Sequence, residues 1–312
     1  MRLFRHYQDF PADARGAVVT LGNFDGVHLG HQAVIARARE IAQRERRPLA
    51  VLTFEPHTRE FFKPDQPPFR LTPLRAKLHA LESLGVDQVI VLAFDKPFSQ
   101  TTPDDFARKI LAEGLGIAHA VAGEDFRYGH KHAGDMKSLA EAGARYGFGV
   151  TAVPAQSGAD GTIYSATAIR GLIAEGRLKE AAIMLGRFWE IDGRVIRGDG
   201  RGAGLGFPTA NIDMSGYLRP AYGIYAVRVQ IEGGDGRWIG GVASLGIRPM
   251  WKVEEPLLEV YLFDFADDLY GRILRVQLVE WLRPEMRFDT VEALIRQVDL
   301  DKEAARKILA AA

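Results

Sequence analysis

The sequence predicts an α/β fold in two parts: a parallel sheet with helices on both faces, then a small antiparallel β-barrel with a terminal helix. The 312 residues exceed one typical domain and suffice for two. Between residues 16 and 153, apolar strand-like runs alternate with amphipathic helical patterns, which is typical of a parallel sheet. Beyond Gly186, short alternating runs separated by glycine turns indicate antiparallel strands. We therefore predict domains 1–186 and 187–312.

The expected elements follow from these patterns. In the first part we expect strands over 17–22, 48–54, 88–94 and 118–123, and helices over 28–46, 73–84, 103–113, 136–146, 166–175 and 178–185. Thr72 before Pro73 and Thr102 before Pro103 each pair a capping hydroxyl with proline at the first helical position. In the second part we expect strands over 189–196, 223–232, 237–246, 257–265 and 273–282, and one helix over 290–311.

The composition excludes several classes of function. The formal net charge is zero, so the chain lacks the cationic surface that non-specific nucleic-acid or membrane binding requires. It contains no cysteine, which excludes disulfides, thiolate zinc sites and cysteine nucleophiles. No apolar run has the length of a signal peptide or of the roughly 20 residues of a membrane span. We therefore expect a cytoplasmic protein that acts on small molecules, with no nucleic-acid or membrane partner.

The first candidate site is the turn between the strand at 17–22 and the helix near His28. A strand-to-helix turn presents unpaired backbone N–H groups at the positive end of the helix dipole, which favours a bound phosphate. His28 and His31 are spaced i, i+3, so they share a helix face and can both reach phosphate oxygens. The segment TFEPHT (53–58) adds His57 at the same sheet edge. Two alternatives stay open here: a zinc site built from these histidines, and ordinary surface or capping roles for His28 and His31.

Four strings in this half resemble the motifs of a known family. Residues 22–31 (GNFDGVHLGH) closely resemble the nucleotide-binding signature of the nucleotidylyltransferase superfamily. Residues 53–58, 123–135 (GEDFRYGHKHAGD) and 165–170 (SATAIR) resemble further motifs of bifunctional riboflavin kinase/FAD synthetase, and that resemblance covers nearly the whole chain. It implies a nucleotidylyltransferase-type sheet in which FMN phosphate attacks the α-phosphorus of ATP and pyrophosphate leaves, with no covalent protein intermediate.

The same resemblance implies roles for individual residues. His28 and His31 would stabilise the triphosphate, and Arg170 would act with them in adenylyl transfer. Phe126 would contact the flavin. The remaining nucleotide and phosphate contacts in this half would come from Gly22, Asn23, Phe24, Asp25, Gly26, His57, Asp125 and Thr167.

Four positions depart from the family pattern, all in this half. Thr58 replaces proline, His132 stands where arginine is usual, Ala166 replaces serine, and Ala168 stands where arginine is common. Losing an arginine removes a permanent bidentate phosphate grip, whereas histidine is mostly neutral at pH 7 unless an anion raises its pKa. We expect adenylyl transfer to survive, because His28, His31 and Arg170 remain.

The most specific string of the second half is GDGRGAGLGFPTAN (198–211). Its glycines could suggest a dinucleotide loop, but a Rossmann fingerprint opens a helix, and here FPTAN follows. A glycine loop whose backbone N–H groups approach ATP phosphates fits better, which assigns Gly202, Gly204 and Gly206 to the nucleotide. Thr209 and Asn211 offer neutral oxygens suited to Mg²⁺ that keeps its waters and phosphate ligands.

This string matches the PTAN motif of riboflavin kinases, and LLEVYLFDFADDLYG (257–271) resembles the catalytic strand of that family. The resemblance implies that Glu259 is the general base that accepts the ribityl hydroxyl proton, and that Arg283 and Phe288 lie beside the flavin. Near the site, Ser244 replaces asparagine and Met250 replaces threonine.

The resemblance as a whole therefore implies a bifunctional enzyme that phosphorylates riboflavin to FMN and adenylylates FMN to FAD. We expect Mg²⁺ with ATP, no tightly bound organic cofactor, and ATP, riboflavin, FMN and FAD as ligands of a monomer or weak homo-oligomer. One alternative is a kinase whose adenylyltransferase module is weakened or inactive. Another is a non-catalytic flavin or nucleotide sensor, which Glu259, Thr209 and Asn211 argue against. RNA binding lacks a basic stripe or interleaved aromatic residues to support it.

Overall fold

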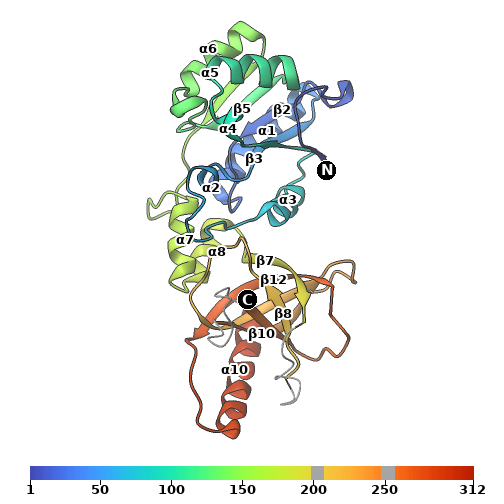
Figure 1. Cartoon of the computed structure of the whole chain (residues 1–312), viewed down its shortest axis with the longest axis vertical. Helices are drawn as coiled ribbons and strands as arrows, with labels where there is room; N and C mark the ends of the chain where they lie inside the picture. Colours follow the sequence, from blue (N-terminus) through green and yellow to red (C-terminus); the bar gives the residue numbers. More distant parts are fainter. Residues whose placement is uncertain (198–206, 247–256) are drawn as a thin grey trace. The chain divides into compact units, whose positions relative to one another are not determined.

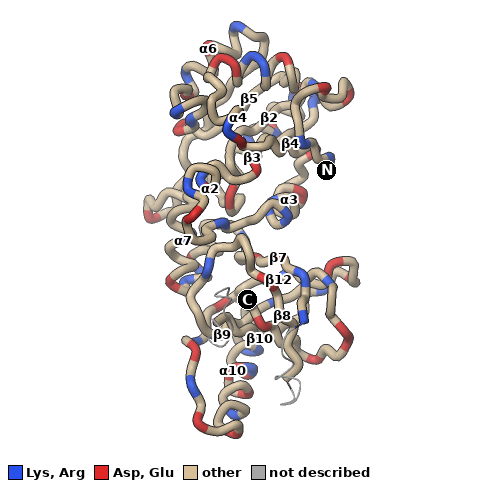
Figure 2. The backbone as a smooth tube through the Cα atoms, in the orientation of Figure 1, with Lys and Arg blue, Asp and Glu red and all other residues tan. Residues whose placement is uncertain are grey.

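The computed structural model describes residues 1–197, 207–246 and 257–312. The chain forms two compact units. The first comprises Met1–Gln66 and Lys77–Ser165, and the second comprises Pro67–Ala76 and Ala166–Ala312. Basic and acidic residues are interspersed along the backbone of each unit (Figure 2). The units are defined by internal contacts and not by function, so the boundary after Gly186 stays a prediction.

The first unit is built on a six-stranded sheet in the order β1-β4-β3-β2-β5-β6, with every neighbouring pair parallel. Figure 1 labels β2, β3 and β5 of this sheet. The expected parallel sheet is confirmed. The strands are β1 (Arg2–Phe4), β2 (Val18–Leu21), β3 (Leu49–Glu55), β4 (Gln88–Ala93), β5 (His119–Gly123) and β6 (Gly149–Val153). We did not predict β1 or β6, because β1 is short and mostly exposed and β6 is only partly buried.

Helices cover both faces of this sheet. They are α1 (Leu29–Glu45), α2 (Thr58–Phe62), α3 (Leu74–Ser83), α4 (Lys96–Ser99), α5 (Pro103–Asp105), a π-helix (Phe106–Leu115) and α6 (Met136–Tyr146), with 3₁₀ turns at Ala12–Ala14 and His130–His132. Alternate strand residues such as Leu21, Leu52 and Ile90 share one core with the π-helix and α6. On α1, one stripe that includes Ile35 and Ile41 is buried. The helices thus bury both faces and leave the strand ends accessible.

The segment 103–113 corrects one prediction. We expected an α-helix, but α5 spans only Pro103–Asp105 and the chain continues as a π-helix to Leu115. The Thr102 cap is confirmed, since its hydroxyl accepts from the Asp105 N–H at 3.1 Å. Over ten residues, an apolar stripe fits the wider π-helical turn about as well as the α-helical one, so periodicity does not separate them.

The strand order places a topological switch point beside β2. From β2 the chain continues to β3 and β4 on one side and then returns to β5 on the other. Ligands of open α/β sheets bind in the crevice at the carboxyl ends of the strands where the order reverses. The segments after β2 and β5 begin at Gly22 and Glu124, so both signature strings lie at this crevice.

The second unit contains a closed antiparallel barrel in the order β10-β11-β8-β7-β12-β9. Figure 1 labels β7, β8, β10 and β12 of this barrel. The expected barrel is confirmed. Its strands are β7 (Trp189–Ile196), β8 (Ala210–Asp213), β9 (Gly223–Ile231), β10 (Ile239–Gly246), β11 (Leu257–Leu262) and β12 (Ile273–Arg283), and its helices are α7 (Ala166–Ala174), α8 (Leu178–Leu185) and α10 (Val291–Ala311). We did not predict β8, which is four residues long and closely follows Pro208.

The terminal helix α10 packs on the outer face of the barrel. Along β11 the side chains of Leu258, Val260 and Leu262 are buried, while Glu259 and Tyr261 alternate with them on the outside. Ala305 of α10 shares a core cluster with Val242 and Phe263, and Tyr261 packs against that cluster. Glu259 therefore lies on the barrel surface that faces the helix.

Candidate active sites

The turn after β2 has an unusual backbone. Phe24, Gly26 and Val27 have φ values of 50°, 81° and 44°. A left-handed conformation is costly for a β-branched residue such as valine and persists only where the surroundings enforce it. Phe24 is 1% exposed and Val27 is fully buried, so packing holds the turn in this shape. Strain of this kind is typical of ligand-binding turns.

His28 and His31 lie at the start of α1. Their rings stack with centroids 3.7 Å apart, which confirms that the two histidines share a helix face. His28 is the N-cap residue, and the ring of His31 also contacts Phe24 at 5.1 Å. A Cβ at Gly30 would lie 3.0 Å from the His28 ring. The glycine between the two histidines therefore leaves space for the His28 imidazole.

His57 follows β3, as expected, and caps α2. Its Nδ1 accepts from the Arg59 N–H at 3.1 Å, so a neutral ring carries its proton on Nε2. Nearby, the Asn23 amide donates to the Thr58 hydroxyl at 3.2 Å, and the Thr53 hydroxyl donates to the Asn23 carbonyl at 3.1 Å. These bonds tie the turn after β2 to the end of β3. Thr58, one of the departures from the family, supplies a contact that proline lacks.

The three histidines do not indicate a zinc centre. Within the described ranges there is no group of three or more His, Cys, Asp or Glu side chains arranged to hold a metal ion. One potential ring ligand, His57 Nδ1, instead accepts a backbone hydrogen bond. The arrangement fits anion binding at the start of α1 better.

A cleft of about 620 Å³ opens at the switch point. Gly22 and Asn23 from the turn after β2 and Asp125 from the segment after β5 line it, so the structure brings these predicted residues together. Much of the remaining wall is aromatic, and it comprises Phe54, Phe62, Phe94, Phe98, Phe106, Phe126 and Tyr128. The Phe126 and Tyr128 rings are nearly parallel, with centroids 5.8 Å apart. Such a wall suits a flat aromatic ligand.

Of this aromatic wall, only Phe126 was expected from the sequence to contact a ligand. Phe54 and Phe94 end predicted strands, and no ligand contact was expected of them. The signal that could have found them is the repeated phenylalanine at the ends of β3 and β4, since the carboxyl ends of parallel strands meet at one sheet edge.

The turn at residues 130–132 adds a basic rim to the same cleft. Lys131 and His132 both have left-handed backbones, with φ values of 54° and 57°, and both are exposed. His130 is anchored, since its Nδ1 lies 3.0 Å from the Ser99 carbonyl oxygen. His132, where the family has arginine, therefore lines the cleft beside a lysine and Arg127.

Thr167 and Arg170 lie on α7, in the second compact unit. The Arg170 Nε–H donates to the Phe69 carbonyl at 2.8 Å, and the guanidinium lies 5.1 Å from the Phe69 ring centroid. Their contact with phosphate, and the effect of Ala166 and Ala168 on it, stay predictions.

The barrel carries a row of three side chains across neighbouring strands. In the strand register, Glu259 of β11 lies directly opposite Asn211 of β8 on one side and Ser244 of β10 on the other. Side chains of directly opposed residues point to the same face of a sheet, about 5 Å apart. Asn211 is 5% exposed, and Thr209 stands two residues before it. A carboxylate thus lies beside the proposed magnesium ligands.

An outer pocket of about 360 Å³ lies over this row, between the barrel and α10. Thr209, Glu259, Arg283 and Phe288 all line it, as does the departure Ser244. The Arg283 guanidinium forms a bidentate ion pair with Asp301 of α10, at 2.9 and 2.6 Å. Arg283 therefore has two roles: it lines the pocket, and its ion pair connects α10 to the end of β12.

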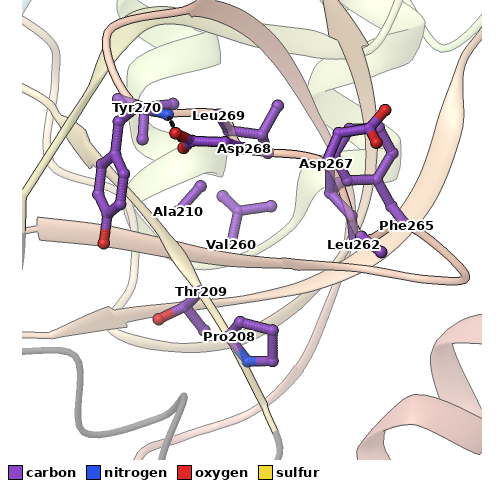
Figure 3. A pocket seen from close by; sticks show the side chains of 12 residues that line it. Pro208, Thr209, Ala210, Val260, Leu262, Phe265, Asp267, Asp268, Leu269 and Tyr270 are labelled. Atoms are coloured by element: carbon purple, nitrogen blue, oxygen red, sulfur yellow. Dashed lines mark hydrogen bonds between the residues drawn. The ribbon is translucent and has the colours of Figure 1, made fainter.

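A second cavity of about 210 Å³ lies at the mouth of the barrel. Figure 3 shows Ala210, Val260 and Leu269 around it, with Thr209 and Pro208 at one side and Tyr270 at another. Thr209 lines both cavities.

Asp267, Asp268 and Tyr270 of this cavity were not predicted as site residues, although they belong to the string 257–271. Four positions named in the sequence analysis, Gly202, Gly204, Gly206 and Met250, lie outside the described residues.

The fold and the two sites define a class of protein: a transferase that combines a nucleotide-binding α/β sheet with a barrel carrying a second phosphate-transfer site. Residues 10–167 match the family model described as FAD synthetase, and residues 185–309 match the model described as riboflavin kinase. The chain belongs to the bifunctional riboflavin kinase/FMN adenylyltransferase family, with the FAD synthetase part N-terminal and the kinase part C-terminal.

Relatives of this family resemble the chain over nearly its full length. The bifunctional riboflavin kinase/FMN adenylyltransferase of Escherichia coli (strain K12) is 38% identical over 98% of this chain and 97% of its own. The protein of the same name from Listeria monocytogenes is 41% identical over 94% of this chain and 92% of its own. A crystal structure titled as a macrolide-efflux protein of Streptococcus pneumoniae has a TM-score of 0.85 and 29% identity, covering 97% of this chain and 98% of its own.

In the described part of this chain, no helix is long and apolar enough to cross a membrane.

Proposed function

We propose that the chain makes FAD from riboflavin in two ATP-dependent steps, phosphorylation to FMN in the barrel and adenylylation of FMN at the switch point of the sheet. The observation that carries the kinase step is the position of Glu259, which lies opposite Asn211 in the register and lines the same pocket as Thr209. A base, a nucleotide-binding hydroxyl and an amide are thus gathered on one barrel face. A non-catalytic sensor would not need the base.

In the kinase step, Glu259 accepts the proton of the terminal ribityl hydroxyl while that oxygen attacks the γ-phosphorus of ATP. The bond from the γ-phosphorus to the bridging oxygen breaks, and ADP leaves. A positioned general base contributes about 10² to 10⁴ in rate. Thr209 and Asn211 would hold Mg²⁺ with the phosphates, since both offer neutral oxygens. When bound, the cation supplies neutralisation of phosphate charge.

The two barrel cavities suit the two substrates. We assign the nucleotide to the cavity at the barrel mouth and the flavin to the outer pocket with Arg283 and Phe288. Thr209 lines both cavities, so it marks the place where phosphate passes from one ligand to the other. Such separate subsites hold the attacking oxygen and the phosphorus in a fixed geometry, which is the main contribution of a protein to phosphoryl transfer.

In the adenylyl step, an FMN phosphate oxygen attacks the α-phosphorus of ATP and pyrophosphate leaves. The start of α1 supplies backbone N–H groups and the helix dipole, and His28 and His31 supply donors to the phosphates. Gly22, Asn23 and Asp125 contact the nucleotide, while Phe126 and the aromatic wall hold the flavin ring. Thr167 and Arg170 hold phosphate late in the reaction.

We further propose a boundary between the two functional domains, an oligomeric state and a cellular location. The family matches end at residue 167 and begin again at 185, which supports functional domains 1–186 and 187–312. We also propose a monomer or weak homo-oligomer that works in the cytoplasm, where ATP is made.

A chromatographic time course of riboflavin with MgATP and purified protein tests the proposal, scoring FMN and FAD separately. We expect FMN to appear first and FAD to follow. FMN without FAD would support the alternative in which His132, Ala166 and Ala168 weaken or inactivate the adenylyltransferase. If neither product formed while ligands still bound, the sensor alternative would replace the proposal.

A further inference from the structure

A second carboxylate lies in the flavin pocket and has no role in the reaction described above. Glu285 lines the pocket together with Glu259. It follows β12 by two residues, and the end of that strand carries register shifts between Leu278 and Glu280 and between Trp281 and Arg283. Bulges bend a strand and redirect the residues beyond it. Glu285 therefore reaches the pocket from a different element than the proposed base.

The Glu285 carboxylate lies against the backbone of Gly246. A Cβ at Gly246 would lie 2.0 Å from Glu285 Oε1, so the carboxylate occupies the space that a side chain would fill there. Gly246 is two residues beyond Ser244 on β10, and Ser244 is directly opposite Glu259. Residues two apart on a strand share a face, so the two carboxylates lie over the same face of the barrel, one step apart.

The charges around Glu285 leave the pocket acidic. From α10, Asp301 forms the bidentate pair with Arg283, and Lys302 forms an ion pair with Asp299 at 3.0 Å. Both cations are therefore already paired with their own carboxylates. Glu285 is exposed overall, but partial desolvation in the pocket raises the pKa of its carboxyl above the ordinary value, and the nearby charge of Glu259 raises it further.

We propose that Glu285 determines specificity in the kinase pocket by favouring the neutral ribityl hydroxyls of riboflavin and disfavouring the phosphate of FMN. This inference rests on the proposed assignment of the outer pocket to the flavin. A carboxylate is a strong acceptor for hydroxyl groups, and it repels a phosphate. The residue thus helps the pocket release its product, which has to leave before the adenylyl step can use it.

The test measures the KM for riboflavin and the competitive inhibition of riboflavin phosphorylation by FMN, in the full-length protein. We expect E285Q to bind FMN about fivefold more tightly and riboflavin about threefold more weakly, since the pocket is open to solvent and partly screened. E285D keeps the negative charge, so its affinities for riboflavin and FMN should return towards the wild-type values. E292Q is the matched control, because Glu292 is exposed in the first turn of α10 and does not line the pocket.

If Glu285 had a purely structural role, E285Q would bind both riboflavin and FMN more weakly. Tighter binding of FMN together with weaker binding of riboflavin therefore distinguishes the proposed role. The acidic side chain also predicts a pH dependence. Its charge is present above its raised pKa and is lost as pH falls through that value, so FMN inhibition of the wild type should strengthen at lower pH more than that of E285Q. Equal pH responses in the two proteins, or parallel loss of both ligands, would overturn the inference. Full activity of E259Q would instead count against the proposed base.

Discussion

At the scale of single residues, the two sites use the same device, a small residue that makes room for a charged or polar one. Gly30 leaves space for the His28 ring, and Gly246 leaves space for the Glu285 carboxylate. In both cases the glycine supplies the volume, although His28 belongs to the same helix start as Gly30, whereas Glu285 comes from the segment after β12 and Gly246 from β10. Substitutions at such positions test the geometry of a site without removing its chemistry.

The first prediction concerns the general base. Replacing Glu259 with Gln keeps the size of the side chain and removes its basicity, so we expect kinase turnover to fall by about 10² to 10⁴. Riboflavin phosphorylation under saturating MgATP measures the change. Folding, ADP binding and the conversion of FMN to FAD by the same variant serve as internal controls and should be unchanged. Wild-type phosphorylation by E259Q would refute the assignment.

The second prediction concerns Gly30. A methyl group there would lie 3.0 Å from the His28 ring and 3.3 Å from the Tyr164 carbonyl oxygen, closer than ordinary contact. The flexible member of this pair is the imidazole, so G30A should displace it and lower FAD synthesis by about tenfold, the size of effect that misplaced catalytic groups produce. G171A is the control, because a Cβ at Gly171 meets no atom within 4 Å. Comparable FAD synthesis by G30A and G171A would argue against a role for His28.

At the scale of elements, α10 links stability to the kinase site. It begins at Thr290, whose hydroxyl accepts from the Ala293 N–H at 3.1 Å, and it carries Asp301, which holds Arg283. The first half of this helix, from Leu294 to Lys302, lines the outer pocket that we assign to the flavin, and Ala305 further along it packs on the barrel. A substitution that destabilises the first turn of α10 should therefore weaken flavin binding more than it slows the phosphoryl transfer step.

The third prediction follows from this cap. Replacing Thr290 with Ala removes a hydrogen bond at the helix start and should destabilise the second unit by about 1 kcal/mol. In a unit of this size the Tm should fall by roughly 2 to 4 °C. We expect the KM for riboflavin to rise while kcat stays near its wild-type value. T290S keeps the hydroxyl and should retain both properties, whereas an equal Tm loss in T290S and T290A would exclude the cap as the cause.

At the scale of the whole molecule, much of the architecture could be predicted because its signals are local. The helix expected over 136–146 is α6 at Met136–Tyr146, and the strand expected over 189–196 is β7 at Trp189–Ile196. Both have clear periodicity and clear ends. The short strands β1 and β8 and the π-helix at Phe106–Leu115 were not predicted, because three to ten residues carry too little pattern to decide between conformations.

The site residues also fall into those that local sequence patterns identify and those that only the tertiary structure reveals. His28, His31 and Glu259 could be identified from compact strings of sequence, and the structure adds the stacking and the strand register that give them neighbours. The aromatic wall of the cleft and Glu285 depend on segments brought together by the fold. No spacing along the chain places Phe54 in the same cleft as Phe126, or Glu285 against Gly246. These contacts needed the tertiary structure.

The last prediction tests how the two halves cooperate. If each site works by itself and FMN leaves the kinase pocket into solvent, a mixture of two defective proteins should still make FAD from riboflavin. E259Q supplies the adenylyltransferase, and a variant with both His28 and His31 replaced by Ala supplies the kinase. We expect FAD to form in the mixture after a lag during which free FMN accumulates, and not in either protein alone. A mixture that makes no FAD, because the histidine variant releases no FMN into solution although E259Q converts added FMN, would mean that FMN does not leave the kinase site through solvent and that only the intact chain completes both steps.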